Sequence, residues 1–166
     1  LGTLTVEEIN NDRQSFAQGK PTSKLKRVKD FRGSGTIITF RPDVEIFGEK
    51  TRFDAEMIRS RLEGKSYLHR GMKVVFTDET QRPPVTIEYQ HAGGIAEYLG
   101  KIVAERGKGA VPPGWTGFYL SRDELPGERS GKCEIALVWS EATDEHVRSY
   151  VNGIPTHSGG THEAGL

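Results

Sequence analysis

The chain has 166 residues, of which 34% are hydrophobic and 28% charged, which suits one domain or two small ones with a lean core. Lys plus Arg equals Asp plus Glu, at 23 each, so there is no global attraction to nucleic acid or anionic membrane. The single Cys133 excludes an internal disulfide and a multi-cysteine zinc cage. No apolar run approaches the roughly 20 residues that cross a bilayer, and we expect a cytoplasmic protein without membrane contact.

Residues 4–17 hold two β-prone stretches around Asn10-Asn11-Asp12, and the turn-tolerant residues between them predict a hairpin. Gly19-Lys20-Pro21 should break the second strand. Residues 24–32 form a basic cluster, which is open to two interpretations: a phosphate contact or, as we favour, a solvated connecting segment.

The β-branched and aromatic residues 37–40 predict a strand, which should end at Arg41-Pro42-Asp43. A helix should begin at Phe53-Asp54, with Asp54 capping its free N–H groups, and should stop at Gly64.

Residues 72–77 and 85–90 predict a second antiparallel pair of strands. Apolar residues at helical spacing predict a helix over 95–104. Three more strands are expected at 117–121, 133–139 and 146–154. Strands that mostly pair antiparallel, together with helices, indicate an α+β fold.

The last ten residues, HSGGTHEAGL, allow three interpretations. His157, His162 and Glu163 could bind a metal, but the five-residue offset places the two imidazoles on different faces of a helix. The glycines could direct backbone N–H groups at a phosphate. We favour a tight turn in which glycine takes unusual dihedrals and Thr161 caps the next helix.

Three blocks carry a family resemblance: residues 35–47 (GTIITFRPDVEIF), residues 89–99 (YQHAGGIAEYL) and residues 151–166 (VNGIPTHSGGTHEAGL). In this order and spacing they resemble the ATPase (B) subunit of bacterial type IIA DNA topoisomerases, the family of the DNA gyrase B subunits and their topoisomerase IV counterparts. The resemblance runs over essentially the whole chain. It departs from the family pattern at Ala92 and Ser158, where the family has acidic residues. The first residue, Leu1, and the unfinished C-terminal helix lead us to expect an internal fragment.

The resemblance implies two domains. Residues 1–92 resemble the C-terminal part of a GHKL-type ATPase domain, and residues 93–166 the start of a ribosomal-protein-like transducer domain. It implies ATP and Mg²⁺ as cofactors, and coupling of ATP hydrolysis to DNA strand passage in supercoiling or decatenation. The implied partners are the DNA-cleaving A subunit, double-stranded DNA and a second B subunit that dimerises on ATP binding.

The resemblance places Gly35 and Thr36 at the floor of the adenine pocket. The Thr36 hydroxyl would help to hold the carboxylate that binds the adenine amino group, and Ile38 would supply apolar wall. The family's catalytic glutamate and Mg²⁺-binding asparagine fall upstream of this sequence, and its phosphate-contacting lysine falls downstream. We therefore expect no catalytic residue and no metal ligand here, and a chain that is inactive alone. The alternative is a non-catalytic interaction module of the same fold.

Overall fold

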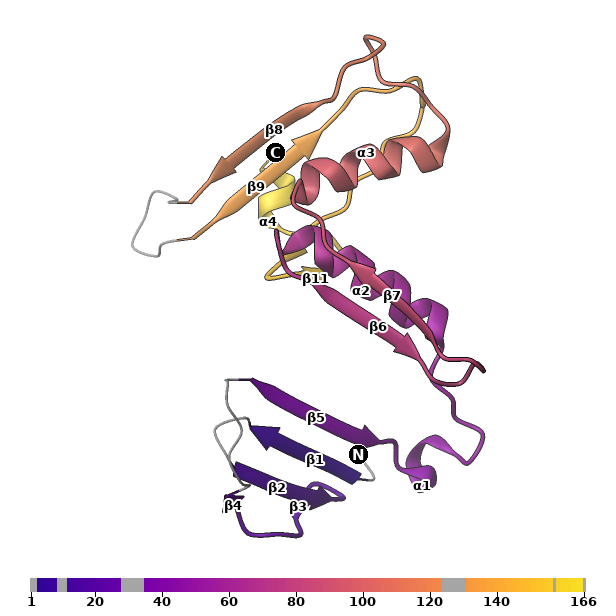
Figure 1. The fold of residues 1–166 in the computed structure, drawn as a ribbon. Coiled ribbons are helices and arrows are strands. Elements are labelled where there is room, and N and C mark those ends of the chain that lie inside the picture. The colour runs from indigo at the N-terminus through magenta and orange to yellow at the C-terminus, as the bar shows by residue number, and fades with distance from the viewer. Residues whose placement is uncertain (1–2, 9–11, 28–34, 124–130, 157, 166) are drawn as a thin grey trace. The chain divides into compact units, whose positions relative to one another are not determined.

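The computed structural model describes residues 3–8, 12–27, 35–123, 131–156 and 158–165 (Figure 1). Its contacts divide the chain into two compact units, Leu1–Phe53 and Asp54–Leu166. Helices and strands occur in both, so the α+β class is confirmed. No described helix has the length and apolar character needed to span a membrane.

The first unit is a small antiparallel sheet in the order β3 (Lys20–Pro21), β2 (Asp12–Ala17), β1 (Thr3–Glu8) and β5 (Thr36–Arg41), with β4 (Lys26–Arg27) also paired to β2. The hairpin of β1 (Thr3–Glu8) and β2 (Asp12–Ala17) is confirmed, although its turn lies outside the described residues. The strand break at Gly19 is also confirmed, and the chain then returns as β3 (Lys20–Pro21). The basic cluster enters the sheet as β4 (Lys26–Arg27), and its residues 28–32 lie outside the described part.

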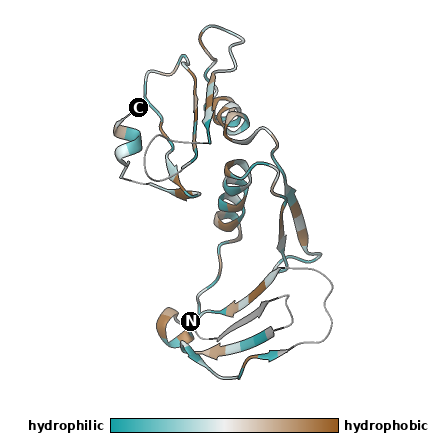
Figure 2. Cartoon of the chain, turned by 90° about the vertical axis from the view of Figure 1, so that its left-hand side faces the viewer, coloured by the Kyte–Doolittle hydropathy of each residue, from teal (hydrophilic) through white to brown (hydrophobic). Residues whose placement is uncertain are grey.

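The predicted strand at residues 37–40 is confirmed as β5 (Thr36–Arg41), which pairs antiparallel with β1. A one-turn helix that we did not predict, α1 (Val44–Phe47), follows it. The buried carboxylate of Asp43 causes this turn, because it accepts a hydrogen bond from the Glu45 N–H at 2.9 Å and so caps the helix. Hydrophobic residues gather on β5 and α1 (Figure 2).

The second unit begins with α2 (Ala55–Leu68), capped as predicted by Asp54, which accepts from the Met57 N–H at 2.9 Å. The predicted stop at Gly64 is wrong, since the helix continues through it for another turn. That turn buries Ser66 and Tyr67. A Cβ at Gly64 would lie 3.7 Å from the hydroxyl of Tyr98, which belongs to the neighbouring helix α3 (Gly94–Arg106). Packing of α2 on this helix outweighs the roughly 1 kcal/mol that glycine costs inside a helix.

Five more predicted elements of the second unit are confirmed. The hairpin of β6 (Val74–Asp78) and β7 (Val85–Tyr89) leads into α3 (Gly94–Arg106). An antiparallel pair follows, β8 (Phe118–Arg122) and β9 (Cys133–Leu137). Helix α3 packs against both α2 and β9, while α2 also packs on β6 (Figure 1).

The predicted strand over 146–154 is wrong. The chain instead forms a short hairpin of β10 (Tyr150–Val151) and β11 (Ile154–Pro155). Between them Asn152 and Gly153 have φ of 51° and 73°, the positive values that a two-residue hairpin turn requires and that an Asn-Gly pair favours. This local turn signal outweighs the alternating pattern.

The C-terminal segment forms a turn followed by α4 (Thr161–Ala164). Gly159 has a φ of 70°, which supports the expected use of glycine in the turn. The predicted capping role of Thr161 is wrong: Gly160 is the capping residue, and no side chain caps this helix. The reason is that the helix begins one residue earlier than the prediction assumed, so Thr161 already lies inside it.

Candidate functional site

The three residues predicted to line a base pocket lie together at the start of β5. Gly35 precedes the strand, Thr36 is its first residue, opposite Glu8, and Ile38 lies opposite Val6. Because side chains alternate along a strand, Thr36, Ile38 and Phe40 share one face of the sheet. All three predicted residues are exposed within this sheet.

This face of β5 combines a hydroxyl with apolar surface. The side chain of Ile38 is 61% exposed, and Phe40 packs edge-to-face on Phe53 with ring centroids 5.6 Å apart. Among the described residues no side-chain hydrogen bond involves Thr36, which leaves its hydroxyl able to donate one bond and accept others. This face of β5 therefore suits contact with a flat, partly polar chemical group. Whether it binds a base stays a prediction.

A second arrangement, which we did not predict, lies between α2 and α3. Tyr67 stacks on His91 with ring centroids 3.5 Å apart and an interplanar angle of 18°. Tyr67 also stacks on Tyr98, with ring centroids 4.7 Å apart and an interplanar angle of 10°. We call Tyr67, His91 and Tyr98 the ring stack. Tyr67, at 5% exposure, is the one buried hydrophobic residue of the described chain.

Two carboxylates flank the ring stack. Glu97 accepts a hydrogen bond from His91, with 2.7 Å between Nδ1 and Oε1, and a second from the Gly93 N–H at 3.1 Å. The bond from His91 is the main reason that the pKa of Glu97 lies below its ordinary value of 4.5. Glu63 of α2 forms an ion pair with Lys101 of α3 at 2.5 Å.

The pKa of Lys101 reflects two opposing influences. Burial is the largest and lowers the pKa, but the hydrogen bond and charge of Glu63 act together with Glu105 and raise it overall. For Tyr67, burial dominates and raises the pKa of the phenol. Lys101 therefore stays charged at neutral pH, and the Tyr67 ring beside it stays neutral.

The segment before β10 also contacts the ring stack. The Arg148 guanidinium lies 5.3 Å from the centre of the Tyr98 ring and donates a hydrogen bond to the Tyr98 hydroxyl. Farther along, the Ser149 hydroxyl bonds both the Thr156 hydroxyl at 2.6 Å and His162 Nε2 at 2.5 Å. These bonds connect α4 to the β10–β11 hairpin.

The described residues of the C-terminal segment show no arrangement that supports the metal interpretation. His162 uses Nε2 on Ser149, and His157 lies outside the described residues. Within the ranges that the structure describes, no three His, Cys, Asp or Glu side chains converge to hold a metal ion.

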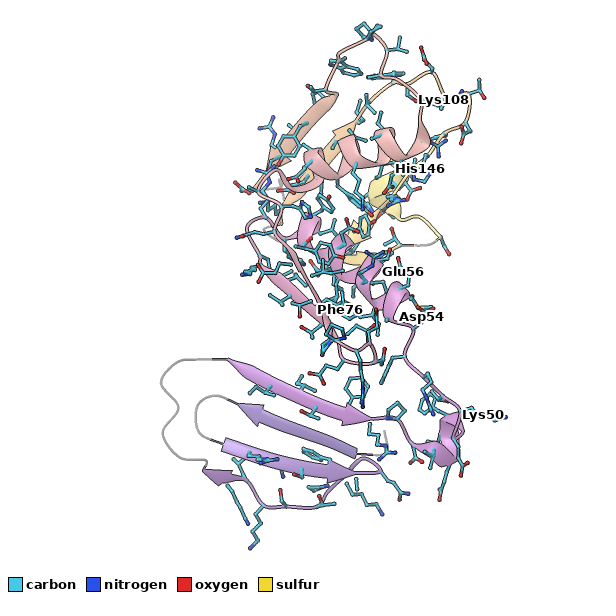
Figure 3. The ribbon with its side chains drawn as sticks, turned by 45° about the vertical axis from the view of Figure 1, so that its right-hand side comes forward. Lys50, Asp54, Glu56, Phe76, Lys108 and His146 are labelled. Atoms are coloured by element: carbon cyan, nitrogen blue, oxygen red, sulfur yellow. The ribbon has the colours of Figure 1, made fainter. Side chains whose placement is uncertain are left out.

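A hollow of about 310 Å³ opens between the first turns of α2 and the β6–β7 hairpin. Glu56 on α2 and Phe76 on β6 mark its two sides (Figure 3). Its polar lining is already engaged: Glu56 pairs with Arg59 at 2.5 Å, and Asp78 accepts from Thr80 and Gln81. The hollow therefore offers few unpaired groups to a ligand.

Sequence comparison gives a consistent set of relatives. Residues 94–166 match the family model described as DNA gyrase B. The chain is 34% identical over 163 residues to the B subunit of DNA topoisomerase 4 from Caulobacter vibrioides, covering 92% of this chain and 22% of that protein. It is 31% identical over 171 residues to the DNA gyrase B subunit of Halalkalibacterium halodurans, covering 100% of this chain and 25% of that protein. The chain thus spans about a quarter of the length of the curated relatives it matches.

Two solved structures share the fold. The crystal structure of the ATPase domain of Thermus thermophilus gyrase B, in complex with an aminocoumarin, matches with a TM-score of 0.77 and 28% identity, over 97% of this chain and 42% of that one. The gyrase B subunit of Myxococcus xanthus matches with a TM-score of 0.67 over 93% of this chain and 43% of that one. At 20% identity the second likeness concerns the fold alone.

Proposed function

The chain belongs to the family of bacterial type IIA DNA topoisomerase B subunits, and on that premise we propose that it forms part of the ATP-binding and transducer region of such a protein. In this role it couples ATP binding and hydrolysis to DNA strand passage. One observation carries the proposal: the likeness to a gyrase B ATPase domain extends over 97% of the chain, not over one motif. Residues 1–92 then belong to the ATPase domain and residues 93–166 to the transducer.

Gly35, Thr36 and Ile38 are proposed to line the adenine pocket of ATP, where the Thr36 hydroxyl helps to hold the carboxylate that binds the adenine amino group. A hydroxyl beside an aliphatic side chain fits a base, which is flat and carries an amino group. The same residues do not fit the phosphates or Mg²⁺, because none carries a charge. Binding must overcome an association cost of roughly 4–15 kcal/mol, so the chain by itself is proposed neither to bind nor to hydrolyse ATP.

The partners proposed for the complete subunit are a DNA-cleaving A subunit, double-stranded DNA and a second B subunit on ATP binding. The proposed compartment is the cytoplasm. The names of the relatives, which are B subunits of DNA gyrase and topoisomerase IV, support the A subunit and DNA as partners. The pairing of two B subunits and the compartment follow from the family resemblance alone.

The test is ATP-dependent strand passage by the complete subunit with its A partner, using Thr36→Val as the variant. This variant loses the proposed hydrogen bond between the Thr36 hydroxyl and the carboxylate that binds the adenine amino group. Loss of a hydrogen bond to a charged group should raise the KM for ATP about tenfold or more. Thr39→Val is the matched control, because Thr39 lies on the same strand but on its opposite face. An unchanged KM for Thr36→Val would refute the role of Thr36 in the adenine pocket, and absence of ATP-dependent passage in the unmodified subunit would refute the function.

A non-catalytic interaction module is the second candidate. It is favoured by the exposed apolar side chains of the first unit, among them Ile46 at 70% and Phe47 at 56% exposure on α1, since such surface marks contact sites. An unmodified subunit that associates with its A partner without any ATP-dependent DNA activity would support this candidate.

A further inference from the structure

We propose that Tyr67 is a positioning residue: held between His91 and Tyr98, it fixes the angle between α2 and α3 and so passes movement of the nucleotide-binding part to the transducer part. This inference rests on the proposed function for its consequence. The geometric claim, that the ring sets the angle, stands on the structure of the second unit.

The covalent connection between the two helices cannot fix their angle. It runs from α2 through the β6–β7 hairpin and enters α3 at Gly93 and Gly94. Gly94 has a φ of 60°, and glycine has the widest choice of backbone dihedrals. The angle therefore depends on side-chain packing, above all on the side chains that cross from one helix to the other.

The side chains that cross do so at two levels. Glu63 and Tyr67 are four residues apart on α2, and Tyr98 and Lys101 are three apart on α3, so each pair occupies one helix face a turn apart. Glu63 meets Lys101 at 2.5 Å, and Tyr67 meets Tyr98 ring to ring at 4.7 Å. Contacts at two levels resist rocking, which one contact would allow. We call these four residues together with His91 the α2–α3 joint.

His91 connects the two helices, because it contacts one residue on each. Its ring stacks on Tyr67 of α2, while its Nδ1 bonds Glu97 in the first turns of α3. Glu97 also accepts from the Gly93 N–H, so it holds the flexible entry to α3. Moving Tyr67 therefore displaces the ring that is hydrogen-bonded to the start of α3.

The end of α2 contacts two further elements of the predicted transducer part. The Arg70 guanidinium lies 4.9 Å from the centre of the Tyr119 ring on β8. His69 lies against the β10–β11 turn, where a Cβ on Gly153 would come within 2.9 Å of its Nε2. Through these contacts a shift of α2 reaches β8 and the β10–β11 hairpin as well as α3.

The geometric test measures one distance in this chain. Spin labels are placed at exposed positions by Ser60→Cys on α2 and Ala104→Cys on α3, with Cys133→Ser to remove the native thiol. A single narrow distance distribution is expected for the otherwise unmodified chain and for Tyr67→Phe, which keeps the ring. Tyr67→Leu should broaden it. A broad distribution without the Tyr67 change, or a narrow one in Tyr67→Leu, would overturn the claim.

The functional test uses the complete subunit with its A partner and counts strand passages per ATP hydrolysed. Tyr67→Leu should lower this ratio about fivefold or more, the lower end of typical coupling between sites, while the KM for ATP stays within about twofold. Tyr67→Phe, which keeps the ring, should leave the ratio as in the unmodified subunit. Phe118→Leu removes an aromatic ring outside the joint and serves as the control, for which the ratio should also stay unchanged. Equal loss of hydrolysis and passage in Tyr67→Leu would overturn the proposal. If the unmodified subunit shows no ATP-dependent passage, the proposed function has failed instead, and the distance measurement still decides the geometric claim.

Discussion

Truncating Tyr67 should destabilise the second unit more than any other aromatic change in it. The ring is 5% exposed and contacts rings on both faces, His91 at 3.5 Å and Tyr98 at 4.7 Å. Removing a large buried aromatic side chain costs about 3–5 kcal/mol, of which the two ring pairs account for about 0.5–1.5 kcal/mol each. We expect Tyr67→Ala to lie in this range. Tyr67→Phe keeps the ring and should cost less than about 1 kcal/mol.

The assay is urea denaturation of the chain followed by circular dichroism, with thermal melting as a second probe. A loss of about 3 kcal/mol should lower Tm by roughly 10 °C in a unit of this size. The comparison of Ala with Phe separates the ring from the hydroxyl. The reasoning would be refuted by a Tyr67→Ala cost below about 1 kcal/mol, or by Tyr67→Phe destabilising as much as Tyr67→Ala.

Three further predictions concern the α2 cap, the Gly153 turn and Glu97. Asp54→Ala removes the cap of α2 and should cost about 0.5–2 kcal/mol in the same denaturation assay. Gly153→Ala introduces a Cβ at a φ of 73°, 2.9 Å from His69, and should cost about 1–3 kcal/mol, whereas Gly100→Ala on α3 has open space and should be neutral or stabilising. The pKa of Glu97 is lowered on folding from 4.5, so its contribution is complete above that pH and is lost as pH falls through the lowered value. Melting from neutral pH to about pH 3 should show that loss, and Glu97→Gln should reduce it.

Local signals predicted much of this fold. Asn and Asp between β-prone stretches predict the β1–β2 hairpin, and Asp54 before an apolar helix face predicts the start of α2. The errors have equally local causes. Gly64 resembles a stop until α3 packs on it, and the alternating pattern of 146–154 hides an Asn-Gly turn that was open to prediction from the pair itself.

The β5 face and the ring stack, which belong to different units of the chain, differ in how well they could be predicted from the sequence. Thr36 and Ile38 share a strand face because the period of a strand is two, so their placement follows once the strand is predicted. The ring stack draws Tyr67 from α2, His91 from the segment after β7, and Tyr98 from α3. No periodicity connects residues so far apart. The spacing of Glu63 with Tyr67 shows only that a charge and a ring share one helix face.

The energetic scale of the α2–α3 joint bears on whether it can transmit a signal. Two ring pairs contribute about 0.5–1.5 kcal/mol each, and a partly exposed ion pair such as Glu63 with Lys101 contributes up to about 1 kcal/mol. The sum is below the roughly 5–15 kcal/mol that separates folded from unfolded domains. It is comparable to the coupling of about 1–3 kcal/mol by which one ligand typically influences a distant site. A joint of this strength defines one angle in the resting chain, yet ligand binding can shift it without unfolding either side. A joint made from a large aliphatic core would be too costly to shift, and a joint of glycines alone would define no angle to transmit.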